Sequence, residues 1–566
     1  MKLNKSLDVD HHVFGRQNWW KFAALAVFCM LALLPGLFSL PPTDRDESLF
    51  SQASRQMVES GNYVDIRVQD KPRYQKPIGI YWLQSASAKI FQPDDKGQVW
   101  VYRIPSALGI TIAVLMTAAL GAVLFNPTIG FVAALMLMGC TIVNVEARLA
   151  TTDASLLAAI TTTQFALARA WRGSRRWSNF VLFWTALGVG VLLKGPIILL
   201  PLVGTVLWLW RSQKTVGWFA NLRPLPGLVY LLLLVSPWFV AISMASHGAF
   251  MEQSAGKDLL DKIWSGQNRG IILPGFHLLI FPFMFFPFSL FTYMALPDIW
   301  LQRKNSAVSF CLGWIVPTWI VFELSLTKLT HYTMPTFPAW ALLSAWALIQ
   351  GYPSLKSVFY KNLVATCWVL IGVAYAIAFI VLAFRFGGDL SAPMSWYQIL
   401  ASIGLVVTQA FGVLFFHRRQ WLRSMAVASL GSLLFMTTVF SQTLPGLSNF
   451  WISTQVVAKV RAAAQCSNPR LITVDFDEPS IVLLGGTKSV LVNTGDAAVE
   501  AARAEPCAFA AVNEDQLNSF TVAMQRETGL PSGDIKPFDT VVGFNLGNGH
   551  WASLSLFAMP HHGVGQ

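Results

Sequence analysis

The chain has 566 residues, of which 54% are hydrophobic and only 12% are charged. A soluble domain carries about 25% charged residues, so this composition excludes an ordinary soluble protein and predicts a surface that mostly faces lipid. The formal net charge of +12 does not indicate nucleic-acid binding, because the basic residues lie in short loops between apolar runs, as in a polytopic membrane protein.

Apolar runs recur along residues 1–441, which we interpret as a membrane domain. A spanning helix needs about 20 mainly apolar residues. The first run, Trp19 to Leu40, is long enough to span, and no small-residue cleavage site follows it, so we interpret it as a span and not as a signal peptide. About thirteen transmembrane helices are predicted, near residues 20–40, 104–124, 128–145, 154–168, 178–193, 196–212, 225–246, 273–296, 307–324, 335–350, 359–384, 397–416 and 424–441.

The loops between these runs alternate between a basic set and a set with few basic residues. The basic set comprises the N-terminus and the loops near residues 169–176, 211–223, 303–304, 356–361 and 418–423. Basic loops remain on the cytoplasmic side of a membrane. We therefore expect a cytoplasmic N-terminus, and an odd number of spans then places the C-terminal region outside.

Residues 41–103 form the first long outer segment and are predicted to contain interfacial helices. In ESLFSQASRQMVESG, apolar residues such as Phe50 and Met57 recur at helical spacing, and Gly61 is expected to end that helix. PIGIYWLQSASAKIF predicts a second helix with Pro77 in its first turn. Both helices are expected in the plane of the lipid headgroups.

The region 442–566 changes character and is predicted to be a small α/β domain outside the membrane. It holds 7 Lys and Arg against 11 Asp and Glu, so the excess positive charge lies in the membrane domain. Short apolar runs favour buried strands at RLITVDF, SIVLLGG, SVLVN and CAFAAVN. TQVVAKVRAAAQ and DAAVEAARA favour helices before or between these strands.

Two of the six cysteines, Cys466 and Cys507, lie in this C-terminal region. The other four, Cys29, Cys140, Cys311 and Cys367, lie in apolar spans. An oxidising compartment outside the membrane permits a disulfide between Cys466 and Cys507, which we predict. The alternative is two separate buried thiols.

Charged side chains gather on the predicted outer face, where charged groups beside spans usually face a cavity or a partner. Lys194 interrupts the apolar run VLLKGPIILL. It is interpreted either as a ligand contact or as a side chain that reaches up to the membrane interface. The acidic and polar candidates are Asp44, Asp46, Glu47, Asp153, His331 and Tyr332, and the basic candidates are Arg45, Lys76, Lys194, Arg269 and Lys328.

Basic groups at a membrane interface suit a lipid phosphate. At about 4 Å and an effective dielectric of about 20, each opposite charge contributes about 4 kcal/mol before desolvation. Several such charges could hold a phosphate and stabilise it as a leaving group. Carboxylates nearby could bind sugar hydroxyls, bind an amine or accept a proton, and composition alone does not choose among these roles.

Five motifs carry a family resemblance: DRDESLF, YQKPIGIYW, ARLATTDASL, LLKGPIILLP and TKLTHYTMPTFPAWALL, in that order over residues 44–346. Together they resemble polyprenyl-phosphate-dependent glycosyltransferases of the protein O-mannosyltransferase superfamily, most of all the lipid A aminoarabinose transferases. The resemblance implies the GT-C fold, with about thirteen transmembrane helices and a periplasmic α/β domain. It also implies an enzyme of the bacterial inner membrane that transfers a sugar, such as 4-amino-4-deoxy-L-arabinose, from undecaprenyl phosphate to lipid A or another envelope acceptor.

The resemblance also implies roles, residue by residue. The catalytic candidates are Asp46, in the first outer loop, and Asp153, in the loop before the fourth span. The donor-phosphate candidates are Lys76, Lys194, Arg269 and Tyr332, of which Arg269 is placed by spacing and not by a motif. Further cavity candidates are Glu47, Gln75, Lys328 and His331.

One residue departs from the family pattern. The aminoarabinose transferases commonly have a glutamate before the lysine of the KP motif, whereas this chain has Gln75. The missing carboxylate weakens the case for a divalent metal, so no cofactor is expected. It also leaves open whether the sugar is an amino sugar and whether the acceptor is lipid A.

Other functions are weighed against this one. A lipid-linked sugar transporter or flippase would also carry charges within the membrane, but the chain shows no obvious internal repeat. A protein O-glycosyltransferase of the same fold would act on a Ser or Thr hydroxyl, and Asp46 would then be essential for removing its proton. A non-catalytic membrane scaffold is disfavoured by the ordered motifs.

Overall fold

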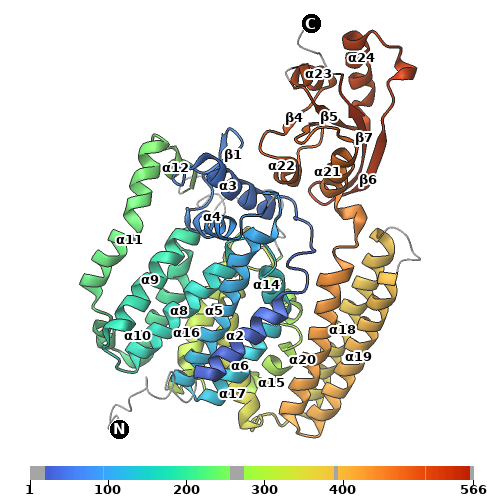
Figure 1. Ribbon diagram of the computed structural model, residues 1–566. Helices are drawn as coiled ribbons and strands as arrows, with labels where there is room; N and C mark the ends of the chain where they lie inside the picture. The colour runs from blue at the N-terminus through green and yellow to red at the C-terminus, as the bar shows by residue number, and fades with distance from the viewer. Residues whose placement is uncertain (1–18, 94, 255–272, 388–392, 504, 561–566) are drawn as a thin grey trace.

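Figure 1 shows a bundle of long helices with a separate unit of strands and helices at one end. The computed structural model describes residues 19–93, 95–254, 273–387, 393–503 and 505–560. The bundle helices are α2 (Trp19–Leu33), α5 (Trp100–Leu124), α6 (Pro127–Gly139), α7 (Thr141–Glu146), α8 (Asp153–Trp171), α9 (Trp177–Lys194), α10 (Leu199–Gln213), α11 (Pro224–Ala245), α14 (Phe276–Met284), α15 (Ser289–Leu301), α16 (Ser306–Leu324), α17 (Phe337–Gln350), α18 (Val358–Phe386), α19 (Pro393–His417) and α20 (Trp421–Thr438).

The prediction of a polytopic helical protein is confirmed, since each predicted span contains an apolar helix. The spans 128–145 and 273–296 each divide into two helices, and the second divides at Pro287, which has no backbone N–H to donate. Among the described residues, seven stretches are long and apolar enough to cross a membrane unaided: Trp100–Leu124, Trp177–Gln213, Pro224–Ala245, Ser306–Leu324, Val358–Phe386, Trp396–His417 and Trp421–Thr443. α2 and α6 are apolar but shorter.

The stretch Trp177–Gln213 is not one continuous helix. α9 ends at Lys194, and a short 3₁₀ helix, η1 (Gly195–Ile198), precedes α10. Gly195 has a φ of 66°, a conformation that glycine adopts freely, and Pro196 has no N–H with which to continue the helix. The break makes Lys194 the last residue of an apolar helix.

Two helices lie across the end of the bundle that faces the strand unit: α3 (Asp46–Ser60) and α4 (Gly79–Phe91) (Figure 1). A short hairpin, β1 (Arg67–Val68) and β2 (Lys71–Pro72), lies between them in the chain, and α12 (Ala249–Met251) follows α11. α3 ends at Gly61, as predicted, with a φ of 72°. Pro77 lies before α4 and not in its first turn, which corrects the prediction by two residues.

The α/β unit beyond the bundle, residues 452–560, is called the sheet domain below. Its helices are α21 (Ile452–Ala463), α22 (Pro479–Gly485), α23 (Gly495–Arg503) and α24 (Leu517–Thr528), and its strands are β3 (Arg470–Val474), β4 (Val490–Val492), β5 (Ala508–Asn513), β6 (Asp539–Asn545) and β7 (His550–Ala558). The strand order is β4-β3-β5-β7-β6. β3 pairs in parallel with β4 and β5, whereas β7 pairs antiparallel with β5 and β6.

Helices cover both faces of this sheet. Val456 of α21 and Ile481 of α22 share one apolar core with Leu471, while Val499 of α23 and Phe520 of α24 share the other core. The predicted strand at SIVLLGG is wrong, because these residues form α22. The run has only seven residues, too few to show a period, and Pro479 at the first helical position was the available signal.

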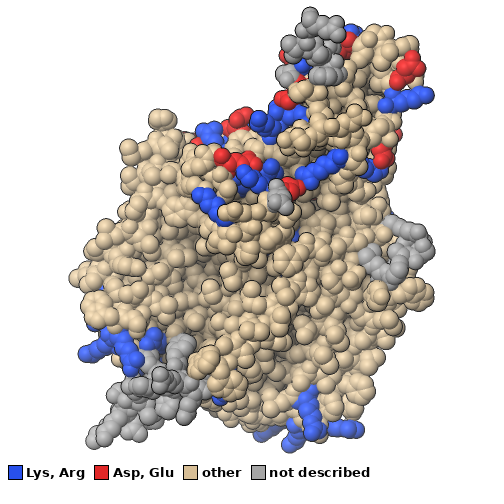
Figure 2. All heavy atoms as spheres, viewed as in Figure 1, with Lys and Arg blue, Asp and Glu red and all other residues tan. Residues whose placement is uncertain are grey.

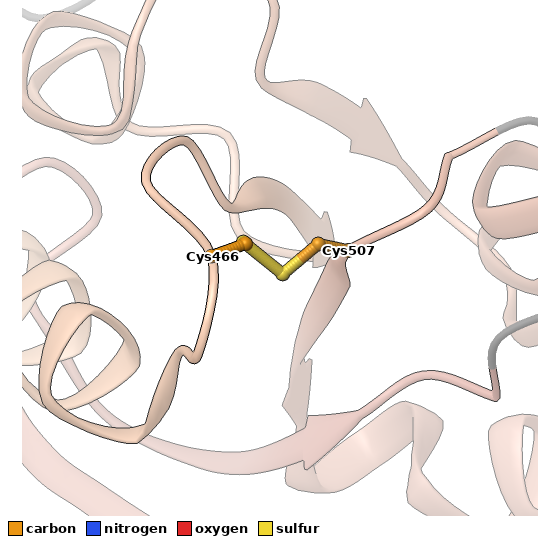
Figure 3. Close-up of a disulfide and its surroundings, with 2 residues drawn as sticks. All are labelled: Cys466 and Cys507. Carbon is orange, nitrogen blue, oxygen red and sulfur yellow. A yellow bond between two sulfur atoms is a disulfide. The ribbon is translucent and has the colours of Figure 1, made fainter.

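A disulfide joins Cys466 and Cys507, which precede β3 and β5 respectively (Figure 3). The two residues are 41 apart in the chain, so the bond closes a long loop and limits the unfolded state of the sheet domain. We expect Cys466→Ser with Cys507→Ser to lower the stability of the sheet domain by about 2–4 kcal/mol. Limited proteolysis in increasing urea would measure the change. Cys367→Ser, at an exposed free cysteine, is the matched control and should leave the urea midpoint unchanged.

Charge is distributed unevenly over the surface (Figure 2). The end of the bundle away from the sheet domain shows Lys and Arg, whereas acidic and basic residues mix where the bundle meets the sheet domain. The surface between these two ends shows almost none of either kind in this view. Such a belt, together with the apolar helices, makes this a multi-pass membrane protein.

Candidate active site

Five polar side chains from separate parts of the chain meet at the end of the bundle covered by α3 and α4. Lys194 Nζ donates to Asp153 Oδ1 over 2.6 Å. His331 lies between two carboxylates, with Nε2 3.9 Å from Asp153 Oδ1 and Nδ1 3.6 Å from Glu146 Oε1. The Lys194 ammonium also faces the Tyr332 ring, 6.0 Å from its centroid. Two carboxylates and up to two cations thus share one small site.

Asp153 is the first residue of α8, but it does not cap that helix. Thr152 occupies the N-cap position, and no side chain caps the helix. The Asp153 carboxylate instead accepts from Lys194 and, at 3.2 Å, from the Thr152 hydroxyl. The buried Asp153 carboxylate therefore faces the site and not the N–H groups of its own helix.

The chain before Asp153 is held by α3 and α4. Glu47 Oε1 accepts from the Ala150 N–H at 2.9 Å, and Gln84 of α4 donates to the Ala150 carbonyl oxygen at 3.0 Å. Each helix therefore bonds the same residue, three positions before Asp153. This arrangement ties the first outer segment to the loop that carries the aspartate.

His331 and Tyr332 lie in the loop between α16 and α17, which several buried groups hold in place. Lys328 Nζ donates to the carbonyl oxygens of Glu323, at 2.6 Å, and Ser325, at 2.8 Å. His277 has its Nδ1 3.2 Å from Glu323 Oε2 and its Nε2 3.2 Å from the Leu329 carbonyl oxygen. Both bonds of Lys328 are made at the end of α16, so this lysine holds the start of the loop that carries the two site residues.

Lys76 lies in a segment whose backbone packs closely against the backbone of α9. It lies in the turn before α4, half-buried, with Nζ 3.2 Å from the Gln75 carbonyl oxygen. Three residues later, Gly79 packs against α9 so closely that a Cβ atom there would lie 2.7 Å from the Leu192 carbonyl oxygen. Leu192 is two residues from Lys194, so the KPIG motif that carries Lys76 packs, through Gly79, against the last turn of α9. Gln75 is exposed.

Asp46 and Glu47 are neighbours with opposite environments. Asp46, the first residue of α3, has a side chain that is 72% exposed, with Oδ1 3.4 Å from Arg73 Nη2. Glu47 is 1% exposed, and both of its carboxylate oxygens accept from Arg103, at 2.8 and 2.9 Å. Burial alone would raise the pKa of Glu47, but the charge and hydrogen bonds of Arg103 lower it below its usual value. Glu47 therefore anchors α3, whereas the Asp46 carboxylate is largely exposed to solvent beside Arg73.

The family described as dolichyl-phosphate-mannose-protein mannosyltransferase matches residues 75–240, which include Lys76, Glu146, Asp153 and Lys194. The undecaprenyl phosphate-α-4-amino-4-deoxy-L-arabinose arabinosyl transferase of Enterobacter sp. (strain 638) is 24% identical over 345 residues, which cover 58% of this chain and 59% of that protein. The corresponding transferase of Pseudomonas aeruginosa PAO1 is 27% identical over 348 residues, which cover 57% of this chain and 60% of that protein. The match thus spans about three fifths of each relative.

The fold extends the likeness over almost the whole chain. The crystal structure of ArnT from Cupriavidus metallidurans bound to undecaprenyl phosphate superposes with a TM-score of 0.70, covering 96% of this chain and 98% of that chain at 18% identity. The chain is therefore similar to the protein O-mannosyltransferase superfamily over residues 75–240, and its overall architecture is the GT-C fold. The resemblance found in the five motifs is confirmed.

In this GT-C protein, Glu146 and Arg103 are among the buried charged residues that were not predicted from the sequence. Glu146 ends α7, 4% exposed, and accepts from the Thr151 hydroxyl at 2.9 Å. Arg103 lies within the first turn of α5 and binds Glu47. The signal that could have found them is the one that found Lys194, a charged residue at the edge of an apolar run. Arg269 lies outside the described residues, so its predicted role stays a prediction.

Metal binding by this GT-C protein stays untested. Over the part of the chain that the structure describes, no group of three or more His, Cys, Asp or Glu side chains is arranged to hold a metal ion. Gln75 cannot supply the carboxylate that the aminoarabinose transferases commonly have at this position.

The Glu47–Arg103 pair yields a stability prediction. Arg103→Met leaves the Glu47 carboxylate buried and unpaired, which should cost about 3–5 kcal/mol and lower the melting temperature in detergent. Because the folded-state pKa of Glu47 is lowered, the pair stabilises the fold fully above the unfolded carboxyl pKa of about 4.3. That stabilisation is lost as the pH falls through the folded-state value. Arg526→Ala, at an exposed pair with Asp496, should change the melting temperature little.

Proposed function

We propose that this chain is a glycosyltransferase that moves a sugar from undecaprenyl phosphate to an envelope acceptor. The observation that carries the proposal is the ion pair between Lys194 and Asp153, buried at the end of a membrane bundle beside His331, Glu146 and Tyr332. An apolar scaffold would not keep such groups at this position without a polar ligand. The names and fold of the relatives support the same class of donor.

The proposed reaction breaks the bond between C1 of the sugar and the phosphate oxygen of the donor. The electron pair stays with the phosphate, and an acceptor oxygen forms the new bond to C1. Lys76 and Lys194, with Tyr332, contact the donor phosphate and stabilise the charge that develops as it leaves. An ammonium carries three N–H donors, and Lys194 directs one at Asp153, which leaves donors for the phosphate.

Asp153 holds the Lys194 ammonium in place, and Asp46 serves the acceptor. If the acceptor is a hydroxyl group, Asp46 takes its proton as the bond to C1 forms. If the acceptor is an ionised phosphate, no proton is removed and Asp46 orients the sugar. We propose 4-amino-4-deoxy-L-arabinose as the first sugar to test and lipid A as the first acceptor, in line with the relatives.

The proposed location is the periplasmic face of the bacterial inner membrane. Basic residues dominate the end of the bundle away from the sheet domain (Figure 2), and basic ends remain in the cytoplasm. The site and the sheet domain would then face the periplasm, where the Cys466–Cys507 disulfide is compatible with an oxidising compartment.

The test uses the purified full chain in detergent with undecaprenyl-phosphate-linked sugars as donors and lipid A as acceptor. We expect thin-layer chromatography to show donor consumption and mass spectrometry to show an added sugar on the acceptor. A lipid-linked sugar transporter would move donor across proteoliposome membranes without consuming it, and that result would contradict the proposal. If a protein and not lipid A receives the sugar, the proposed activity becomes protein O-glycosylation.

A further inference from the structure

The sheet domain contacts the two residues that directly precede Asp46. Asp44 Oδ1 accepts the N–H of Ser480, in the first turn of α22, over 3.2 Å. The Arg45 guanidinium donates to the carbonyl oxygen of Gly547, in the turn between β6 and β7. Two separate segments of the sheet domain thus hold adjacent residues at the entrance to α3.

The backbone at this entrance has an unusual conformation. Arg45 has a φ of 62° and a ψ of −113°, a region that residues other than glycine rarely occupy and that persists only when surrounding contacts impose it. On the other side of Asp46, Arg103 and Ala150 hold Glu47. Asp46 therefore lies between a residue fixed by the sheet domain and a residue fixed by the bundle.

We propose that the sheet domain positions Asp46 for the transfer reaction, with Asp44 and Arg45 as positioning residues. Their contacts with Ser480 and Gly547 set the direction in which the chain enters α3, and with it the direction of the exposed Asp46 side chain. The hydrogen bonds of Lys194 and Asp153 are made within the bundle. This inference rests on the proposed function, and it gives the sheet domain a role in turnover and not in donor binding.

The same interface supplies a matched control away from Asp46. Arg461 of α21 has Nη1 2.8 Å from Asp95 Oδ2 and donates through Nη2 to the Leu484 carbonyl oxygen. Asp95 lies beyond α4 in the chain, so this contact joins the sheet domain to the bundle without touching the start of α3. Arg461→Ala therefore weakens the interface and leaves both neighbours of Asp46 in place.

The test compares Arg45→Gly and Asp44→Ala with Arg461→Ala in the full chain. Glycine adopts the Arg45 conformation freely, so Arg45→Gly removes the contact without adding strain. We expect kcat for transfer to fall at least about tenfold in both variants, with the donor KM within about twofold of wild type. Arg461→Ala should change neither constant by more than about twofold. Arg45→Lys, which keeps the charge, and Asp44→Asn, which keeps an acceptor oxygen, should restore most of the turnover.

Hydrogen–deuterium exchange of residues 44–50 supplies a second measurement that needs no activity. We expect faster exchange in Arg45→Gly and Asp44→Ala but not in Arg461→Ala. Equal loss of turnover in all three variants, or unchanged turnover in the first two, overturns the positioning role. If exchange at the start of α3 is the same in wild type and in both variants, the positioning role is overturned, whether or not the wild-type chain transfers sugar. If the wild-type chain transfers no sugar, that result by itself contradicts only the proposed function.

Discussion

Lys194→Met is expected to abolish sugar transfer, with a fall in kcat of about 10²–10³-fold or more. The substitution keeps an unbranched side chain but removes the charge that stabilises the departing phosphate, and the loss of one such donor has effects of this size. It also leaves the buried Asp153 carboxylate without its shortest polar contact, the 2.6 Å bond to Lys194. A lower melting temperature should therefore accompany the lost activity.

The double variant Lys194→Met with Asp153→Asn separates these two effects. With both charges removed, no unpaired buried ion remains from this pair, so the melting temperature should recover toward the wild-type value. Transfer should stay lost, because the phosphate still lacks the ammonium. Recovery of transfer in the double variant would show that Lys194 serves only to neutralise Asp153, and the phosphate-site assignment would then fail.

Lys76→Ala should also abolish transfer, with little change in melting temperature because Lys76 is only half-buried.

Asp46→Asn is expected to reduce transfer at least about 100-fold, the contribution of a carboxylate that takes the acceptor's proton or orients the sugar. Asparagine has nearly the same shape, and the Asp46 side chain is 72% exposed in its pair with Arg73. Exposed pairs of this kind contribute about 0–1 kcal/mol, so the melting temperature should stay near that of wild type. Initial rates with saturating donor would measure the loss.

Asp70→Asn is the matched control for this variant, since Asp70 is an exposed aspartate in the turn between β1 and β2. It should retain transfer within about threefold, as a surface change away from the reacting atoms. A folded Asp46→Asn protein with near-normal rates would remove Asp46 from the mechanism. Asp153→Asn should also lower kcat, because the Lys194 ammonium loses the carboxylate that holds it in place.

The helical bundle could be predicted from the sequence because lipid-facing helices are apolar over most of their surface, which leaves long continuous runs. The positions at which these runs break into separate helices were harder to predict. Lys194 was recognised as unusual, but the end of α9 depends on the conformation of Gly195 and on Pro196. In the sheet domain, RLITVDF and CAFAAVN were predicted correctly as strands, whereas β6, β7 and α24 were not predicted. β7 could have been predicted, because its run ASLSL alternates between apolar and polar residues.

The candidate site could be predicted only in part. Asp153, Lys194 and His331 were named from motifs and charge, and the structure brings them together. Glu146 was missed, because its contact with His331 joins residues far apart in the chain. The different roles of Asp46 and Glu47 also depend on a tertiary partner, since only the position of Arg103 shows which carboxylate is buried.

The contact between Gly79 and α9 limits how this protein could be recombined with its relatives. The space at Gly79 admits no side chain, because a Cβ atom would lie 2.7 Å from the Leu192 carbonyl oxygen and 2.8 Å from its carbon. The loop that bears Lys76 and the helix that bears Lys194 therefore fit as a matched pair of surfaces. A chimera that exchanges residues 41–103 for the segment of a relative should keep its activity only if the end of α9 is exchanged with it.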